Sequence, residues 1–477
     1  MKEVIEELLK REEEFHLCEK EVNGFQFWQY ERYYIDSFLR LSGKTAKSAK
    51  GSKRRILKYY LVNSDRIKQK QPIDVCFIPH PRRHLWNGVY ECIYTDAVTQ
   101  KFPASISLER LYERNHMEPI LSSNVVYMDR TVIEASLYNI LNGVLRKGKK
   151  KKIAEQIYKE ISISMQGLLT EEQMKKIARK TSDDYYIYKY SYRKLKTMLS
   201  QMKPKIVVEV VSYNSKCMVI NEICKELGIL TIELQHGWIG RDHVAYNYAP
   251  GSVVKQFPDK IYLFGEYYKT KANFPISQDN LIITGFPYYE RELQKYKEHR
   301  RKDTRYTILF LSQGSYTKFL PQLAVDLRKM TDKNHVRILY KLHPIEYHDW
   351  QQTSPLLLEK GIEVIGAKDM PLYECFANSD VQIGAYSTAI YEGLGFHLRT
   401  FIFEQAFADR LQDLIDLGIA EKVKSAIEIV EKIQIQDYNA YDIDYFWKRN
   451  ALHNLEQTLR DELDQVMQSS SEERRER

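Results

Sequence analysis

Apolar residues along this chain fall into short runs that alternate with longer segments of helical periodicity. Short β-branched and apolar runs are typical of buried strands, and their alternation with helices predicts a parallel sheet. In the first half, the predicted strands are residues 73–79, 123–129, 205–211 and 229–234. A second set begins near Lys260 and comprises KIYLFGE, LIITGFP, YTILFLSQG, VRILYKLHP, IEVIG, VQIGAYS and GFHLRTFIFE.

Two sets of strands in 477 residues predict two α/β domains. We expect a helical N-terminal extension over residues 1–70 and a Rossmann-like domain over 71–252. A second Rossmann-like domain is expected over 253–436, followed by a C-terminal helix and frayed tail over 437–477. The predicted fold class is therefore α/β, with two Rossmann-like domains facing a central cleft.

The composition is that of a globular protein from a reducing compartment. Hydrophobic residues make up 43% of the chain and aromatic residues 12%, which excludes extensive disorder. The six cysteines form no CxxC pair, so we expect buried free thiols. The first residues predict a charged amphipathic helix without the apolar core of a signal peptide, and no apolar run is long enough to span a membrane. We expect a cytoplasmic protein, with peripheral attachment to the inner face of the plasma membrane as a further hypothesis.

The positive charge is concentrated in one part of the chain. Residues 44–200 hold 31 Lys and Arg against 15 Asp and Glu, including the dense runs Lys44–Arg55 and Arg146–Lys152. Two interpretations stay open: solvated loops, or attraction to an anionic surface such as a phospholipid membrane or a phosphate-bearing acceptor. No module that reads RNA or DNA accompanies the charge, so we expect no nucleic-acid partner.

The aromatic helix predicted over Phe25–Leu41 also has two interpretations. It either packs on the N-terminal domain or contacts a membrane interface through Trp28 and its tyrosines.

His236 is the leading candidate for catalysis. It follows the predicted strand 229–234, and ligands of open α/β sheets bind at the carboxyl ends of strands. A neutral imidazole there can take a proton from an attacking hydroxyl near pH 7, although a histidine bonded to a backbone carbonyl is the structural alternative. Arg241 and His243 make the same loop rich in polar side chains.

A second candidate group lies in the later set of strands. Lys341 and His343 alternate onto one face of a predicted strand that Pro344 ends. An ammonium group beside an imidazole suits a phosphate or a nucleotide base, while a simple ion pair of Lys341 is the alternative.

Small polar residues add two further elements. Gly314 follows a strong strand and could let the backbone approach a diphosphate, or form a plain turn. Ser387 and Thr388 precede a helix whose first N–H groups could bind phosphate or be capped, and Glu392 could accept hydrogen bonds from ribose hydroxyls. No GxGxxG, GxxxxGK[ST] or HExxH motif occurs. Asp442 and Asp444 are interpreted as helix-capping residues, and no metal site is expected.

With these elements in place, the chain resembles the GT-B glycosyltransferase superfamily over about residues 70–435. Within it, the resemblance is to bacterial capsule and surface-polysaccharide transferases, such as polysialyltransferases and CDP-glycerol glycerophosphotransferases. It rests on the His-Gly loop at His236, on KLHP, on the Ser-Thr…Glu element and on ITGFPYYE. The resemblance implies that His236 is catalytic and that Lys341, His343, Ser387, Thr388 and Glu392 bind the nucleotide of the donor.

The first hypothesis is a metal-independent glycosyltransferase without a cofactor, acting from a nucleotide-sugar donor on a surface polysaccharide or its lipid-linked precursor. A glycerophosphate or polyol-phosphate transferase is the alternative. A nucleotide-sugar epimerase and a basic, non-catalytic scaffold at the membrane surface rank lower. Five residues are weaker candidates for contact with the acceptor: Arg82, Arg83 and His84 after the first predicted strand, and Arg241 and His243 in the loop after His236.

Overall fold

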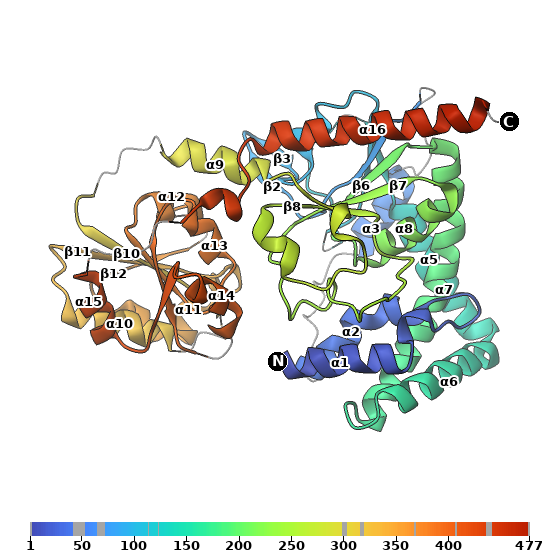
Figure 1. The fold of residues 1–477 in the computed structure, drawn as a ribbon. Coiled ribbons are helices and arrows are strands. Elements are labelled where there is room, and N and C mark those ends of the chain that lie inside the picture. The colour runs from blue at the N-terminus through green and yellow to red at the C-terminus, as the bar shows by residue number, and fades with distance from the viewer. Residues whose placement is uncertain are drawn as a thin grey trace. The chain divides into compact units, whose positions relative to one another are not determined.

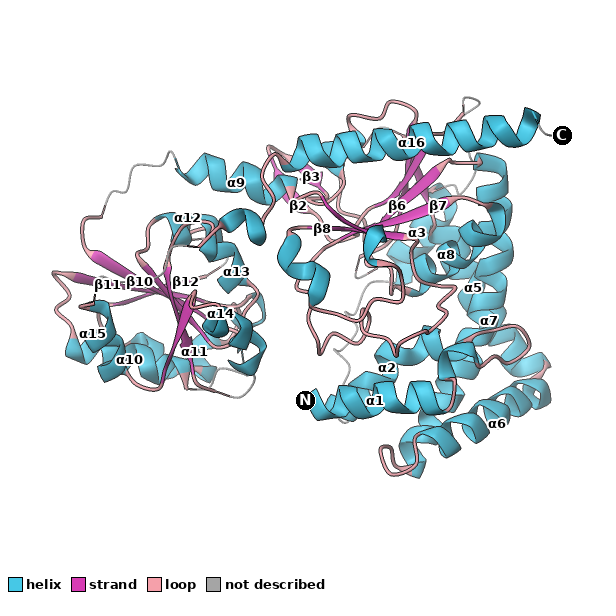
Figure 2. Ribbon diagram, in the orientation of Figure 1, coloured by secondary structure: helices cyan, strands magenta, loops and turns pink. Residues whose placement is uncertain are grey.

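The computed structural model describes residues 2–41, 53–63, 72–112, 114–122, 124–297, 303–314, 319–366, 369–405, 408–435 and 441–475. The chain divides into two compact units, Met1–Pro287 with Asn450–Arg477, and Tyr288–Arg449. Each unit contains a sheet flanked by helices (Figures 1 and 2). The α/β architecture predicted from the sequence is therefore confirmed.

The first unit is built on a seven-stranded sheet in which all neighbours are parallel. Its order is β5-β4-β1-β6-β7-β8-β9, the doubly wound order of a Rossmann-like domain. The order reverses between β1 and β6, and ligands of such sheets bind at the carboxyl ends beside that point. The strands are β1 (Val75–Ile78), β4 (Ser105–Glu109), β5 (Val125–Tyr127), β6 (Ile206–Val210), β7 (Leu230–Leu234), β8 (Lys260–Leu263) and β9 (Leu281–Ile283); β2 (His84–Trp86) and β3 (Val89–Glu91) form a separate antiparallel pair.

Two strands that we expected in the second domain belong to this sheet. Leu234 of β7 pairs with Tyr262 of β8, which in turn pairs with Ile282 of β9. The second set of strands therefore does not begin at Lys260, and the units divide at Pro287 instead of at residue 252. The reason is that a buried apolar strand carries no signal of which parallel sheet it extends.

Both ends of the chain contribute to the first unit. The C-terminal helix α16 (Ala451–Arg475) packs its Leu455 and Leu459 against Phe77 and its neighbours on one face of the sheet. Figure 1 shows this helix, in red, running along the first unit. The C-terminal helix predicted from the sequence is thus part of the core of this unit.

The opposite face of the sheet contacts α8 (Ser215–Leu227). Side chains alternate along a strand, so Glu209 of β6 points away from the face that α16 covers. Asn221 of α8 donates a hydrogen bond from Nδ2 to Glu209 Oε1 over 2.7 Å. The α8 face of the sheet therefore holds buried polar groups.

The remaining helices of the first unit gather around α7 (Glu171–Met202), which contacts α2, α5, α6 and α8. They are α1 (Lys2–Glu14), α2 (Phe27–Leu41), α3 (Lys53–Val62), α4 (Asp96–Thr99), α5 (Asp129–Leu145) and α6 (Lys147–Ser164). None of the described helices is long and apolar enough to cross a membrane. All six cysteines are free and buried, as predicted.

The aromatic helix of the N-terminal extension is α2, and it packs inside its own unit. Trp28 is fully buried and its Nε1 donates to Glu12 of α1 over 2.8 Å. The packing interpretation is therefore confirmed for Trp28, and the interpretation that Trp28 contacts a membrane is wrong.

The second unit has a six-stranded parallel sheet in the order β12-β11-β10-β13-β14-β15. This is again a Rossmann-like order, and it reverses between β10 and β13. The strands are β10 (Tyr306–Leu311), β11 (Val336–Lys341), β12 (Ile362–Ile365), β13 (Val381–Gly384), β14 (Arg399–Phe403) and β15 (Ala420–Val423). The helices are α9 (Pro287–Lys297), α10 (Leu320–Met330), α11 (Trp350–Thr353), α12 (Leu372–Ala377), α13 (Ala389–Leu394), α14 (Gln412–Asp416) and α15 (Ala426–Ile433).

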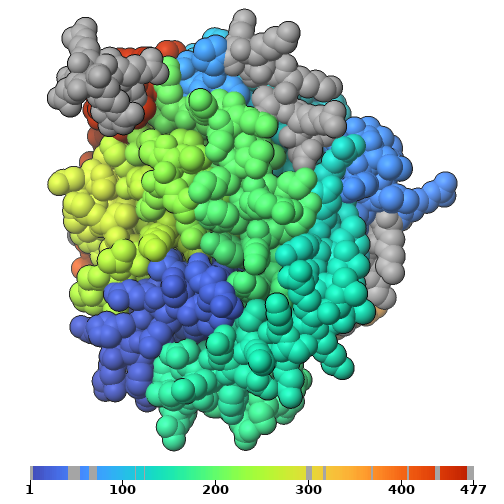
Figure 3. All heavy atoms as spheres, turned by 90° about the vertical axis from the view of Figure 1, so that its right-hand side faces the viewer, coloured from blue at the N-terminus to red at the C-terminus, as the bar shows by residue number. Residues whose placement is uncertain are grey.

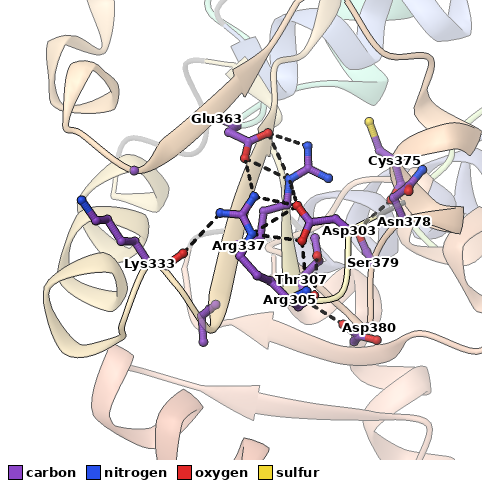
Figure 4. Close-up of polar contacts among 12 residues, drawn as sticks. Asp303, Arg305, Thr307, Lys333, Arg337, Glu363, Cys375, Asn378, Ser379 and Asp380 are labelled. Carbon is purple, nitrogen blue, oxygen red and sulfur yellow. Dashed lines mark hydrogen bonds and ion pairs between the residues drawn. The ribbon is translucent and has the colours of Figure 1, made fainter. Parts of the chain in front are cut away.

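Four charged side chains join the amino ends of β10, β11 and β12 (Figure 4). Arg305 Nε lies 3.0 Å from Asp303 Oδ1, and Arg337 Nε lies 2.9 Å from Glu363 Oε1. Each arginine also lies within 3.6 Å of the carboxylate on the other side. Hydrogen bonds from Arg305 hold the pKa of Asp303 well below its usual range. This amino-edge network, Asp303, Arg305, Arg337 and Glu363, gives each of its charges two partners of opposite sign.

Candidate functional site

His236 lies directly beyond the carboxyl end of β7, one strand away from the point where the order of the first sheet reverses. Its side chain is 16% exposed, so the ring is mostly enclosed but reachable from solvent. The sequence predicted this placement from the apolar run before it. The surroundings of the ring were not predicted.

Three side chains fix the orientation of the His236 ring. Nε2 lies 3.1 Å from the Tyr213 hydroxyl, while Nδ1 lies 3.5 Å from the Tyr246 hydroxyl and 3.6 Å from Glu233 Oε1. Tyr246 donates its own proton to Glu233 over 2.7 Å, so its oxygen remains to accept a proton from Nδ1. We therefore assign the proton of the neutral imidazole to Nδ1, which leaves Nε2 as a proton acceptor.

Behind this ring lie two buried carboxyl groups, Glu233 and Glu209. They are direct partners on adjacent strands, and both are fully buried. Oε1 of Glu233 also accepts the Ser212 N–H at 3.2 Å, but Oε2 of each glutamate accepts no hydrogen bond from any described residue. Burial, and then the proximity of Glu233, raise the pKa of Glu209 to about 7. Acidic groups are therefore concentrated beneath His236 in an environment that water does not reach.

The backbone that carries Tyr213 is strained. Val211, the residue after β6, has φ 66°, in the left-handed region that a β-branched residue rarely adopts. Strain of this kind costs on the order of 1–3 kcal/mol and clusters at functional sites, where the surrounding structure enforces it. The turn brings Ser212 N–H to Glu233 and the Tyr213 hydroxyl to His236. The strained turn therefore contacts both His236 and Glu233.

Two further side chains lie near His236, one just before α4 and one just after β1. The Tyr94 hydroxyl donates to the His236 carbonyl over 2.8 Å, and its ring stacks on Phe286 at 5.3 Å. His80, just after β1, accepts the Arg82 N–H on Nδ1 at 3.1 Å. Burial, with a smaller contribution from the nearby His236, lowers the pKa of His80 to about 4. His80 is thus a neutral imidazole near pH 7, with Nε2 as its donor.

The N-terminal extension holds the loop that follows His236. Arg32 of α2, itself ion-paired with Glu12, donates to the carbonyl groups of Val244 and Asn247. Arg40 of the same helix lies 3.4 Å from Asp242. Residues far apart in sequence therefore fix the shape of this loop, and the extension is part of the site's framework.

The structure separates the five residues proposed for the acceptor side. Arg83 is buried, where it lies 2.9 Å from Asp96 and also pairs with Glu109, so it is committed to a structural ion-pair cluster. Arg82 and Arg241 are exposed, and His84 is exposed at the start of β2. His243 packs its ring 4.9 Å from that of Tyr246, and burial lowers its pKa to about 3. Among the five, Arg82 is joined to the site through His80.

In the second unit, the predicted residues follow three adjacent strands, β11, β10 and β13. Gly314 lies past β10 with φ 68°, and a Cβ at this position would lie 2.9 Å from Ile345 Cγ2. The loops after β10 and β11 are therefore in contact, and glycine is required by both conformation and space. This brings Gly314 close to the KLHP element, as the predicted site requires.

Lys341 and His343 do not share a strand face as predicted, because β11 ends at Lys341. Lys341 Nζ donates to the carbonyl groups of Gly366 and Met370, both at 2.9 Å, and burial lowers its pKa. His343 instead caps the turn that begins at Pro344: its Nδ1 accepts the Ile345 N–H at 3.3 Å. This bond assigns the proton of a neutral His343 to Nε2, making Nε2 a donor.

Ser387, Thr388 and Glu392 lie after β13, on the other side of the reversal point. Ser387 Oγ accepts the Ala389 N–H at 3.3 Å, in the turn that leads into α13. Glu392 accepts the Tyr373 hydroxyl at 2.5 Å, and burial raises its pKa. A ribose hydroxyl would therefore compete with the Tyr373 hydroxyl for Glu392.

The described residues contain no group of three or more His, Cys, Asp and Glu side chains arranged to hold a metal ion. The groups that sequence reasoning missed are Glu209, Glu233, Tyr213 and His80, while Tyr246 was noted only as one of several polar residues in the loop after His236. A signal existed for the two glutamates, since each is a single charge within an otherwise apolar strand. The tyrosines gave none, because the chain has 35 of them and only the fold selects which approach the histidine.

No protein-family model matches the chain. No curated protein matches its sequence. Among solved structures, the chain is similar to the UDP-GlcNAc 2-epimerase of Methanocaldococcus jannaschii, with a TM-score of 0.50 at 10% identity over 82% of this chain and 99% of that one. It also matches the UDP-GlcNAc 2-epimerase of Neisseria meningitidis (TM-score 0.46, 12% identity, 82% of this chain and 100% of that one) and the wall teichoic acid polymerase TagF (0.44, 12%, 92% and 98%).

The first of these likenesses, together with the two parallel Rossmann-like sheets, gives the chain the GT-B fold that the sequence predicted. At 10% identity the likeness establishes the fold alone. The reaction has to be argued from the residues at the carboxyl ends of the two sheets.

Proposed function

We propose that this protein is a glycosyltransferase, which moves a sugar from a nucleotide-activated donor to a hydroxyl group of a bacterial surface polysaccharide or its lipid-linked precursor. The observation that carries the proposal is the arrangement around His236, where Nδ1 is directed to Tyr246 and Glu233 and Nε2 is the accepting nitrogen, 3.1 Å from the Tyr213 hydroxyl that the hydroxyl of the sugar acceptor would replace. A histidine held in this way by a carboxylate is suited to general-base catalysis. A nucleotide-sugar donor is consistent with the fold, since the similar Methanocaldococcus jannaschii protein is named for UDP-GlcNAc.

In the proposed reaction, Nε2 of His236 takes the proton of the acceptor hydroxyl as its oxygen attacks the anomeric carbon of the donor. The bond between that carbon and the phosphate oxygen breaks, and the nucleotide leaves with the electron pair. The imidazolium ion formed is stabilised by Glu233, 3.6 Å from Nδ1. Its proton then passes to solvent through the exposed edge of the ring.

The second unit holds the donor nucleotide in this proposal. We assign three groups to this role: Nε2 of His343 as a hydrogen-bond donor, the Ser387 hydroxyl, and the backbone of the loop at Gly314. Lys341 contributes positive charge, although its ammonium group already anchors two carbonyls. Such donors stabilise the negative charge that develops on the leaving phosphate, each by about 3 kcal/mol where oxyanion sites have been tested. The proposed reaction needs no metal ion.

The test is a thermal-shift titration of the full chain with CMP, CDP, UDP, GDP and ADP, without added metal. A nucleotide at one hundred times its Kd stabilises a protein by about 2.7 kcal/mol, which a raised Tm reports. We expect one nucleotide to stand out. Stabilisation by none of the five would contradict a donor site in the second unit.

The products decide which reaction follows. A sugar transferase releases free nucleotide and leaves no phosphorus in the acceptor, whereas a glycerophosphate transferase incorporates phosphorus. An epimerase converts the nucleotide-sugar in the absence of any acceptor. Incubation of the matching donor with and without acceptor, followed by separation of the nucleotides and phosphorus analysis of the polymer, therefore distinguishes the three. Conversion without acceptor would overturn the proposal.

A further inference from the structure

Helix α5 exposes its large aliphatic side chains, the reverse of an ordinary surface helix. Its buried positions include Ala135 and Asn142, of which Asn142 donates to the carbonyl of Tyr138 over 2.7 Å. Its exposed positions carry the large aliphatic side chains, spaced three and four residues apart, with exposed fractions from 51% to 78%. We call these five the α5 stripe: Leu137, Ile140, Leu141, Val144 and Leu145. A surface helix normally turns such a stripe to the core, so this one is available to something outside the unit.

A second helix extends this apolar surface. Helix α3 contacts α5, where Asn63 donates to Asp129 over 2.7 Å and Arg130 to the Tyr60 carbonyl over 3.0 Å. Its Leu57, Leu61 and Val62 are 58%, 65% and 68% exposed. In Figure 3, α3 in blue and α5 in teal lie on the face turned toward the viewer. Two adjacent helices therefore expose aliphatic side chains together.

Positive charge flanks the aliphatic side chains of both helices. The α5 stripe runs directly into the exposed Lys147, Lys149, Lys151 and Lys152 at the start of α6, and α3 carries the exposed Arg54, Arg55 and Lys58. From Ala135 to Ala154 the chain has six Lys and Arg and no acidic residue. The second predicted basic run is thus a helix start next to an apolar stripe, whereas Lys44–Ser52 of the first run lies outside the described residues.

The same end of α5 borders a basic groove between α6 and α7. This groove, of about 480 Å³, is lined by Lys147, Lys150, Lys151, Lys175 and Arg179, with Glu155 and Asp183 as its acidic residues. Lys150 links the groove to α5 by donating to Asn139 over 2.8 Å. The excess of positive charge therefore continues from the stripe onto the neighbouring helices.

We infer that the α5 stripe, together with the exposed side chains of α3, inserts into the interfacial region of a membrane that contains anionic phospholipid. An aliphatic stripe bordered by lysine and arginine is complementary to acyl chains bordered by phosphate groups. A second copy of the chain would bring these same cations against one another, so charge disfavours a symmetric dimer on this face. The surface brings the first unit to a lipid layer, which is where a lipid-linked acceptor would be. The inference does not rest on the proposed reaction, because membrane binding is measured without substrate.

The experiment is co-sedimentation of the full chain with vesicles of phosphatidylcholine alone or with one-third phosphatidylglycerol. We expect the protein to bind the anionic vesicles at least about tenfold more tightly, because each lysine or arginine near such a surface adds to the attraction. Raising the salt concentration should weaken binding, since the charges lie at the water-exposed side of the interface. Equal binding to both vesicles, or binding to neither, would overturn the inference.

The stripe is tested by the variant Ile140→Gln, Leu141→Gln, Val144→Gln and Leu145→Gln. Glutamine is a good helix former and these positions are exposed, so the helix should be retained. We expect its vesicle binding to fall about 100-fold, because the inserted apolar area is lost. The matched control, Leu358→Gln with Ile427→Gln, alters exposed aliphatic residues of the second unit and should bind as the unchanged protein does. Circular dichroism and Tm of both variants report folding independently.

The basic flank is tested by Lys149→Gln, Lys151→Gln and Lys152→Gln against Lys329→Gln, Lys333→Gln and Lys360→Gln. Both sets remove three exposed lysines and so change the net charge equally. We expect only the first set to lose binding, by about tenfold or more. Equal losses would mean general attraction instead of a defined surface, and would overturn the inference. Normal vesicle binding by the folded stripe variant would also overturn the inference. So would a dimer of the unchanged protein that the stripe substitutions dissociate, if neither protein bound vesicles.

Discussion

The two sheets of this protein share a strand order, but they place different chemistry beside the reversal point. In the first unit, large side chains converge there: His236, Tyr213, Tyr246 and the buried Glu233. In the second unit, the corresponding ends carry small residues and turn-capping groups, among them Gly314 and Ser387. The same topology thus brings large polar side chains together in one unit, and a glycine and a serine hydroxyl in the other.

Under the proposed function, the two units carry out two different tasks. A base needs its proton affinity and orientation set by neighbours, which requires buried carboxylates and the strain at Val211. An anion site needs exposed N–H groups and little side-chain bulk. The charged groups of the amino-edge network lie at the opposite ends of these strands (Figure 4).

The change expected to break this division most severely is His236→Ala. Removal of a general base lowers turnover by about 10²–10⁴-fold, while the nucleotide should still bind because its proposed ligands lie in the other unit. The measurement is the transfer rate alongside the nucleotide thermal shift. Near-native turnover would remove His236 from the mechanism, and loss of the thermal shift would contradict the division of tasks.

Glu233→Gln asks whether the carboxylate beneath the ring acts through His236. The amide keeps the size and can still accept from Tyr246, but it cannot stabilise an imidazolium ion. We expect kcat to fall by about 10-fold to 100-fold, as for other partners that orient a functional histidine, with KM little changed. A fall in KM and kcat together, or a lower Tm without a change in kcat, would indicate a purely structural role. The pH profile of kcat should shift for this variant.

Glu209→Gln tests the buried acidic pair through stability. Because the folded-state pKa of Glu209 is raised to about 7 from 4.5, its contribution to stability is fully present below about pH 4.5 and is lost as the pH rises through 7. The glutamine variant has no charge to bury, so it should be more stable than the unchanged protein at pH 8, by about 3 kcal/mol, and similar at pH 4.5. Urea unfolding at both pH values measures this. A difference that does not vary with pH would contradict the assignment.

Gly314→Ala probes the surface of the second unit. The added Cβ would lie 2.9 Å from Ile345 Cγ2, and the alanine would have to adopt the positive φ of 68°. We expect a loss of about 1 kcal/mol in stability and weaker nucleotide binding. Gly148→Ala is the control, because a Cβ there has open space in helix α6. Unchanged nucleotide affinity in Gly314→Ala would move the donor site away from this loop.

The smallest effect is expected at the amino-edge network. Asp303→Asn removes one charge from a network at the edge of the sheet, where Asp303 is 22% exposed, so solvent screening should keep the loss at pH 7 below about 1 kcal/mol. The pKa of Asp303 is depressed, so its contribution is present above its ordinary pKa and is lost as the pH falls through the folded value. Thermal unfolding at pH 7 with nucleotide titration checks this. Any change in nucleotide affinity would contradict a purely structural role.

The sequence alone indicated the α/β class, two Rossmann-like sets of strands and the placement of His236 beyond β7. Each of these depends on local order: apolar runs, helix periodicity and a polar residue at the end of a strand. It misassigned β8 and β9, since strand pairing depends on contacts distant in sequence. It also extended β11 to His343, because the end of a strand depends on its neighbours.

Only the tertiary structure decided what surrounds the histidine and which side of α5 is exposed. Tyr213, Glu233 and Tyr246 reach His236 through the strained turn after β6, the register of β7 and a loop that α2 holds in place. The α5 sequence predicts an apolar helix, and its packing against α7 determines that small residues face inward and leucines outward. Local patterns set the strands and helices because they depend on neighbouring residues. The chemistry of the site and the surface depends on residues that only folding brings together.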